Sequence, residues 1–242
     1  MSDPIRIAMW SGPRNLSTAM MRSFGSRPDT YVADEPFYAA YLAGTELDHP
    51  IREEVLASQP TDWREAVAGM LADPPTGAPI FYQKHMTHHM LPGFGVEWMR
   101  EFRNAFLIRD PTRVLASYAR KRSRVTLADI GYPRQAELFA LEADRLGRPP
   151  PVVEDVDVLR DPAGTLSRLC AALEIPWTET MLSWPAGPRA TDGVWAPVWY
   201  DAVERSTGFA TPPEREMALA DDLRRLADEA RPIFVELRRW KL

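Results

Sequence analysis

Short apolar runs that lead directly into helix-start signals recur along this chain, and they limit its possible folds more than any other feature. Ile5–Trp10 is followed by a turn-rich segment and then by a helical face over Ala19–Phe24 that Gly25 closes. Asn104–Ile108 is followed by Asp110-Pro111, a typical helix start. Continuous apolar strands that alternate with helices are typical of parallel sheets buried on both faces. We therefore expect an α/β fold, a parallel β-sheet with helices on both faces.

The remaining elements follow from the same signals. Further strands are predicted at residues 31–33, 80–82 and 151–154, and further helices begin near Thr61, Asp161 and Thr211. Pro232 is expected to kink the last helix. We find no internal repeat. We expect a single domain over residues 1–242, with a C-terminal helical extension from about residue 211.

Composition narrows the class of protein. No apolar run approaches the roughly 20 residues that span a bilayer, the N-terminus carries no secretory signal pattern, and Cys170 is the only cysteine. We therefore expect a cytoplasmic protein that neither spans nor binds a membrane. The net charge of −5 argues against nucleic-acid binding. Among 29 basic residues only Lys84, Lys121 and Lys241 are lysines, so lysine chemistry has few candidates.

Two segments have the features of anion sites. Ser11–Thr18 and Arg109–Ser117 follow strands, and ligands of parallel sheets bind beyond the carboxyl ends of the strands. The first segment offers backbone N–H groups at a helix N-terminus, the hydroxyls of Ser17 and Thr18 and the charge of Arg14. These groups suit a terminal phosphate or sulfate. The segment lacks Gly-Lys-Ser/Thr, and no clear Walker B aspartate follows, which disfavours magnesium-dependent nucleotide chemistry.

Four segments carry a resemblance to sulfotransferases that use 3′-phosphoadenylyl sulfate (PAPS). Pro13–Thr18 resembles their P-K-S-G-T-T phosphosulfate loop, and Phe106–Pro111 with Ser117 is similar to their second motif, in which an arginine and a serine hold the 3′-phosphate. Glu154-Asp155, followed by Leu159, Asp161-Pro162 and the helical face from Leu166 to Leu173, resembles their late strand and helix. Arg189–Trp195 resembles their K-G-x-x-G-D-W loop over the cofactor.

The resemblance implies a P-loop NTPase-like sulfotransferase fold and transfer of a sulfonate group from PAPS to a hydroxyl or amine of a small-molecule acceptor. It implies PAPS as cofactor, without a metal, and the following cofactor-binding residues: Arg14, Asn15, Leu16, Ser17, Thr18, Arg109, Ser117, Arg189 and Trp195. Trp195 is expected to stack on adenine. Arg14 stands where the family has lysine, which implies a role in stabilising charge and not in donating a proton. Leu16 replaces a glycine.

Two residues are candidates for the base that removes the acceptor's proton. Glu35, in Glu-Pro, resembles the F-E-P segment of carbohydrate sulfotransferases, and His85, in Gln-Lys-His, resembles the K-x-H of cytosolic sulfotransferases. We favour His85, because it follows a strand expected to end on the same side of the sheet as the one before Arg14. With Arg14, these form the predicted catalytic set.

Several alternatives stay open. A P-loop-type kinase shares the strand-loop-helix phosphate site, and a nucleotide-binding protein that lost catalysis is suggested by Arg14 and Leu16. A pyridoxal-phosphate enzyme would have to use Lys84. His85, His88 and His89 suggest metal binding as a further hypothesis. No metal-ligand signature accompanies them, however, and no metal is predicted. The acceptor and the oligomeric state are not predicted.

Overall fold

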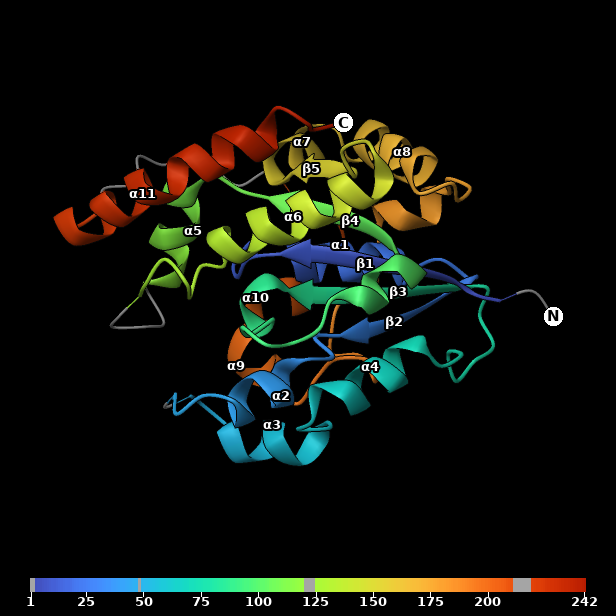
Figure 1. Cartoon of the computed structure of the whole chain (residues 1–242). Helices are drawn as coiled ribbons and strands as arrows, with labels where there is room; N and C mark the ends of the chain where they lie inside the picture. The colour runs from blue at the N-terminus through green and yellow to red at the C-terminus, as the bar shows by residue number, and fades with distance from the viewer. Residues whose placement is uncertain (1–2, 48, 120–124, 211–218) are drawn as a thin grey trace.

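The computed structural model describes residues 3–47, 49–119, 125–210 and 219–242, and within them the chain forms a five-stranded sheet in the order β2-β3-β1-β4-β5 (Figure 1). The strands are β1 (Ile5–Ser11), β2 (Thr30–Asp34), β3 (Ile80–Met86), β4 (Arg103–Ile108) and β5 (Val152–Glu154). Each neighbouring pair is parallel. The predicted parallel α/β fold is confirmed, and all five predicted strands are present.

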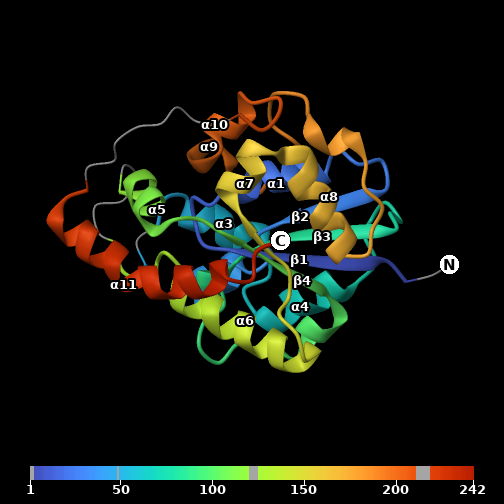
Figure 2. The ribbon, with the colours of Figure 1, turned by 90° about the horizontal axis from the view of Figure 1, so that it is seen from above.

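The helices of the described ranges are α1 (Ser17–Phe24), α2 (Tyr38–Ala43), α3 (Arg52–Ser58), α4 (Trp63–Leu71), α5 (Pro111–Tyr118), α6 (Tyr132–Leu146), α7 (Asp155–Arg160), α8 (Pro162–Ala172), α9 (Ala196–Trp199), α10 (Asp201–Glu204) and α11 (Asp221–Arg238). Short 3₁₀ turns occupy Thr87–His89, Glu97–Glu101 and Glu179–Leu182. The helices lie on both sides of the sheet (Figures 1 and 2). None of the helices in the described part of the chain is long and apolar enough to cross a membrane.

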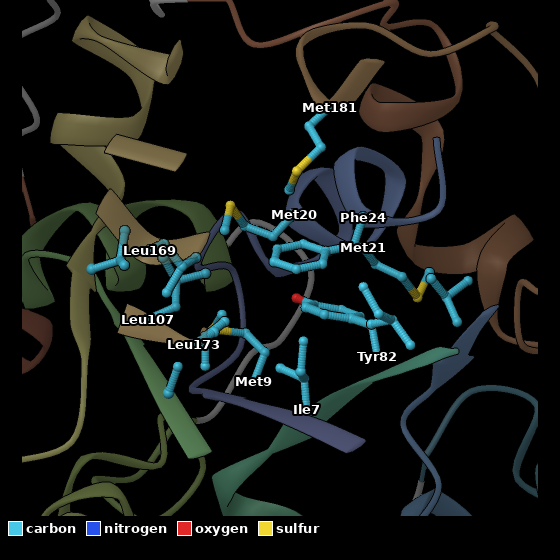
Figure 3. Packing of buried hydrophobic residues seen from close by; sticks show 14 of the residues in the cluster. Ile7, Met9, Met20, Met21, Phe24, Tyr82, Leu107, Leu169, Leu173 and Met181 are labelled. Carbon is cyan, nitrogen blue, oxygen red and sulfur yellow. The ribbon is translucent and has the colours of Figure 1, made fainter. Parts of the chain in front are cut away.

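Side chains alternate along each strand, and this alternation divides the core into two layers. Ile7 and Met9 of β1 pack with α1 and α8, whereas Ala8 and Trp10 pack with α6 and α11 on the opposite face. Figure 3 shows the first layer, in which Met20, Met21 and Phe24 of α1 lie over β1 and β3. The Phe24 ring stacks on Tyr82 with centroids 4.2 Å apart. This packing places the start of α1 directly beyond the end of β1.

Side-chain caps begin three of the helices that the sequence predicted, α4, α5 and α8. The carboxylate of Asp110 accepts a 2.9 Å hydrogen bond from a backbone N–H of α5, and Asp161 does the same for α8. In α4 the cap is Asp62, one residue after the predicted Thr61, because the Asp62 carboxylate reaches the N–H of Arg64 at 2.8 Å.

The C-terminal region packs on the sheet layer shared by α5 and α6. The helix start predicted at Thr211 lies outside the described residues, and the helix the structure describes there is α11. It continues through Pro232 to Arg238, and its buried face belongs to the same hydrophobic cluster as Trp10. Beyond it, Lys241 pairs in parallel with Val152, and the N–H of Leu242 donates to the Val152 carbonyl at 3.0 Å.

Candidate functional site

A pocket with a volume of about 370 Å³ opens at the carboxyl ends of the central strands. Its lining includes seven of the residues predicted from the sequence to bind the cofactor: Arg14, Asn15, Leu16, Ser17, Thr18, Arg109 and Ser117. Glu35, one of the two candidate bases, lines it as well. The structure therefore brings together two segments that lie about ninety residues apart in the chain.

Backbone strain concentrates around this pocket. Among the described residues, five that are not glycine have a positive φ, and three of them line the pocket: Arg14 (φ 58°), Leu16 (φ 60°) and Glu35 (φ 44°). Such a conformation costs a non-glycine residue roughly 1–3 kcal/mol and clusters at functional sites. Leu16 thus adopts the left-handed conformation that glycine adopts most easily, in the position where the resembling family has glycine. No side chain caps the first turn of α1.

The two predicted anion segments are joined by direct hydrogen bonds. Nε of Arg14 donates to Oγ of Ser117 at 3.0 Å, and Nη1 of Arg109 donates to the Arg14 carbonyl at 2.7 Å. Arg109 is also oriented by an ion pair with Asp155, with Nε 3.1 Å from Oδ2. Burial lowers the pKa of Arg109, which Asp155 opposes, and the guanidinium stays charged at neutral pH. Both positive groups are held at one wall of the pocket.

A buried ionic cluster lines another part of the pocket. Lys84, at 1% side-chain exposure, donates from Nζ to Oδ1 of Asp34 at 2.9 Å and to Oε1 of Glu35 at 2.6 Å. It also donates to the Tyr200 hydroxyl, which in turn donates to Oδ2 of Asp34 at 2.7 Å. Two carboxylates thus share one ammonium. The second Glu35 oxygen, Oε2, lies 3.9 Å from Nε2 of His89.

The protonation behaviour of this cluster follows from its burial. Burial raises the pKa of Glu35, an effect that the Lys84 charge opposes and the Asp34 charge reinforces. Burial disfavours the charged form of Lys84, but the charges of Asp34 and Glu35 outweigh it and raise its pKa. A carboxylate with a raised pKa binds a proton more strongly than an exposed one, so Glu35 is suited to accept a proton in the pocket.

His85 does not line the pocket. Because side chains alternate along β3, Lys84 faces the pocket and His85 points to the other face of the sheet. There it lies among aromatic rings, 4.5 Å from the centroid of Trp10 and 5.8 Å from that of Trp98. Neither ring nitrogen has a hydrogen-bond partner, and burial lowers the pKa of His85 to about 3. This placement contradicts the geometry on which we favoured His85 as the base.

Trp195 and Arg189 also lie away from the pocket. Trp195 is 1% exposed, and its indole Nε1 donates to the Tyr200 hydroxyl at 3.0 Å, behind the ionic cluster. It has no open face for adenine. The backbone N–H of Arg189 donates to Asp192 at 2.7 Å, and its side chain lines a different cavity. The expectation that these two residues contact the cofactor in the pocket is therefore corrected, because the loop that carries them packs against α1 and β2.

Several lining residues were not assigned from the sequence. They are aromatic or histidine side chains from segments without a readable motif: Tyr38, His49, His88, His89, Tyr118, Trp199 and Phe209. The His89 ring is sandwiched between Tyr38 and Tyr41, with centroids 4.4 and 4.7 Å away. Within the described ranges no group of three His, Cys, Asp or Glu side chains is arranged to hold a metal ion. Arg120, Lys121, Arg122 and Arg124, the basic residues that follow the Arg109–Ser117 segment in the sequence, lie outside the described residues.

Comparison with known families and proteins extends this description. The family model described as "Sulfotransferase domain" matches residues 5–238. The solved structure titled "Crystal Structure of Sulfotransferase from Alicyclobacillus acidocaldarius" superposes with a TM-score of 0.57 at 16% identity, covering 99% of this chain and 96% of that one. The "Sulfotransferase Domain from the Curacin Biosynthetic Pathway" gives a TM-score of 0.54 at 18% identity, covering 94% and 98%. These likenesses show a shared fold.

Two curated relatives are longer proteins. "Branched-chain-amino-acid aminotransferase-like protein 1" from Arabidopsis thaliana is 40% identical over 215 residues, which are 88% of this chain and 38% of that protein. "Branched-chain-amino-acid aminotransferase-like protein 2" from the same plant is 38% identical over 208 residues, 85% of this chain and 36% of that protein. The chain therefore spans less than two fifths of the length of these relatives.

Proposed function

The chain belongs to the Sulfotransferase domain family, and from that premise we propose that it transfers a sulfonate group from PAPS to a hydroxyl or amine of a small molecule. The observation that carries the proposal is the donor set of the main pocket. Two arginines, three hydroxyl side chains and the start of α1 converge there from segments distant in the chain. Such a set suits the phosphate and sulfate groups of PAPS.

The anion-binding wall would hold the two ends of the cofactor. When bound, PAPS supplies the sulfonate on a phosphate leaving group. Arg14, with Ser17 and Thr18 at the start of α1, is placed to balance charge on that phosphate. Arg109 and Ser117 are placed for the 3′-phosphate, and the Arg14–Ser117 hydrogen bond of 3.0 Å joins the two subsites. Arg14 acts by its charge, because arginine does not release its proton near neutral pH.

Glu35 is the proposed base. Its Oε1 is held by Lys84, and the residue lines the pocket, where the carboxylate would accept the acceptor's proton during attack on sulfur. The positive φ of Glu35 sets this orientation, and the Glu35 N–H is fixed by a 3.0 Å hydrogen bond to the Lys84 carbonyl. General-base groups of this kind contribute about 10²- to 10⁴-fold to rates.

The side of the pocket beside Glu35 favours a small, largely apolar acceptor. Tyr38, Trp199, Val203 and Phe209 line it, and Glu35 is the only carboxylate among the described lining residues. Aromatic and aliphatic walls with one polar reacting group are typical of small-molecule sites.

Lys84 argues against a pyridoxal-phosphate reaction in this domain, although the curated relatives carry an aminotransferase-like name. A Schiff base needs a neutral, nucleophilic amine. The Lys84 ammonium is bound by Asp34, Glu35 and Tyr200, and its pKa is raised by the two carboxylates against the effect of burial. The lysine therefore stays protonated, which supports a positioning role for it.

Nucleotide binding tests the proposal before the acceptor is known. We expect 3′-phosphoadenosine 5′-phosphate, the product of PAPS, to raise the melting temperature of the protein in a calorimetric scan, without added metal. Adenosine 5′-phosphate, which lacks the 3′-phosphate, should raise it less. In Arg109→Ala this difference should disappear, since the guanidinium is worth about 1.5–3 kcal/mol to a bound anion. Equal effects of both nucleotides on the unaltered protein would contradict the assignment.

A further inference from the structure

A second cavity, with a volume of about 190 Å³, lies beside the C-terminal half of α1 and the beginning of β2. It shares no lining residue with the main pocket. Two arginines, Arg22 and Arg189, contribute to its wall together with the hydroxyl residues Thr30, Tyr31 and Thr191. No aspartate or glutamate is among the described residues that line it.

The charges around this cavity do not balance. Asp192 serves both arginines: its Oδ2 accepts from Nη2 of Arg22 at 2.6 Å and from the backbone N–H of Arg189 at 2.7 Å. The Asp192 carboxylate therefore hydrogen-bonds to the guanidinium of Arg22 but only to the backbone of Arg189. Asp29, next to Thr30, does not make up the difference, because Arg27 binds both of its carboxylate oxygens, at 2.9 and 2.8 Å.

Three guanidinium nitrogens at the cavity also lack acceptors. The Arg22 side chain is 2% exposed, and its Nε and Nη1 have no hydrogen-bond partner in the described part of the chain. Nη2 of Arg189 is buried and unpaired as well. Burial and the neighbouring Arg22 charge lower the pKa of Arg189. Buried charged donors without acceptors are strongly unfavourable. Oδ1 of Asp192 is buried and unpaired as well, but one oxygen cannot satisfy all three nitrogens, so they call for further acceptor oxygens.

We propose that this cavity is a second anion site, which binds a small oxyanion of the phosphate and sulfate class between Arg22 and Arg189. The planar guanidinium forks match the oxygens of a tetrahedral oxyanion, whose negative charge opposes the excess positive charge of the two arginines. The anion also has a structural consequence. Gly193, on the loop after Arg189, donates its N–H to Oδ2 of Asp34 at 3.1 Å. An anion that holds Arg189 thereby holds this loop against the Asp34–Lys84–Glu35 cluster.

Anion titrations in a protein with a weakened main pocket test the proposal. In the Arg109→Ala protein, inorganic phosphate and sulfate should each raise the melting temperature more than chloride at equal ionic strength, and isothermal titration calorimetry should give the affinity. Adding Arg189→Gln should weaken that affinity tenfold or more. Arg225→Gln, which removes an exposed arginine of α11, is the matched control and should leave it unchanged.

The outcomes separate a bound anion from a cavity filled only with water. If phosphate and sulfate act no differently from chloride, or if Arg189→Gln leaves their affinity unchanged, the second anion site does not exist. Should Arg189→Gln fail to fold, the side-chain Nε resonance of Arg22 in the Arg109→Ala protein gives the answer. Phosphate should shift it, and an unshifted resonance overturns the proposal. The test is independent of the proposed sulfonate transfer, because no nucleotide or acceptor takes part.

Discussion

Glu35 and His85 show how one position along a strand decides what a titratable side chain can do. Glu35 ends a strand at the pocket and is bound to a lysine, whereas His85 is enclosed by Trp10, Phe37, Trp98 and Phe102. A base must reach the proton that it removes. Only Glu35 of the two borders the pocket.

Substitution of these two residues separates their roles. Glu35→Gln keeps the shape of the side chain and removes its proton affinity, so turnover should fall about 10²- to 10⁴-fold while nucleotide affinity changes little. His85→Phe should leave turnover near that of the unaltered protein. Steady-state rates, together with calorimetric nucleotide affinities, measure both effects. A Glu35→Gln protein with full turnover would exclude Glu35 as the base.

The sequence correctly indicated that the Arg14 loop and the Arg109–Ser117 pair meet at one pocket, but it misplaced His85, and the cause is physical. The Arg14 loop and the Arg109–Ser117 pair follow from local signals, namely apolar strands that run into helix starts. The prediction for His85 assumed a strand that ends at residue 82, whereas β3 continues to Met86. In a strand, neighbouring side chains point to opposite faces, so the extension turned His85 away and brought Lys84 to the site.

At the scale of elements, α5 and α8 allow a matched comparison. Both begin with an Asp-Pro pair whose carboxylate caps the helix, but α5 carries Ser117 and α8 lies on the other side of β5. Asp110→Ala and Asp161→Ala should each lower the free energy of unfolding by about 1 kcal/mol. Only Asp110→Ala should also weaken binding of 3′-phosphoadenosine 5′-phosphate, because it loosens the helix that presents Ser117.

Urea denaturation and nucleotide titration of the two variants measure these effects. Equal nucleotide affinities in both variants would mean that the α5 start does not position the anion site.

The predicted caps were accurate because Asp-Pro is a local signal. Helices α2, α3, α6, α7, α9 and α10 were not predicted, since their formation depends on packing around the pocket and the sheet and not on a local start motif.

For the whole molecule, the buried histidines make folding sensitive to acid. Burial lowers the pKa of His85 to about 3 and that of His89 well below its usual value, so both stay neutral when folded. The unfolded chain binds these protons near pH 6.5, and the folded chain does not. Stability should therefore fall as the pH drops below about 6.5, by up to about 1.4 kcal/mol per pH unit for each group.

Unfolding midpoints in urea between pH 7.5 and pH 5 measure this dependence. His85→Phe should reduce the slope, because the phenyl ring fits the aromatic surroundings and has no proton to gain. It should also raise stability at pH 5 relative to the unaltered protein. A variant with the same slope as the unaltered protein would show that His85 does not contribute to the acid sensitivity.

The order of the sheet was not predictable from local signals, since it depends on which strands pair across long separations. Each strand could be recognised separately, but the signals do not show that β2 forms one edge of the sheet beside β3, or that β5 forms the other edge. The late segment around Trp195 illustrates the same limit: its motif is readable, yet Trp195 and Gly193 pack against Tyr200 and Asp34, away from the main pocket.

The last two residues shield an edge of the sheet from association with other molecules. Strand β5 would otherwise present unpaired backbone groups, a template on which another chain can add a strand. Lys241 pairs beside Val152, the N–H of Leu242 donates to its carbonyl at 3.0 Å, and Nζ of Lys241 binds Glu154 at 2.9 Å. Two residues of chain thereby act as a barrier to aggregation.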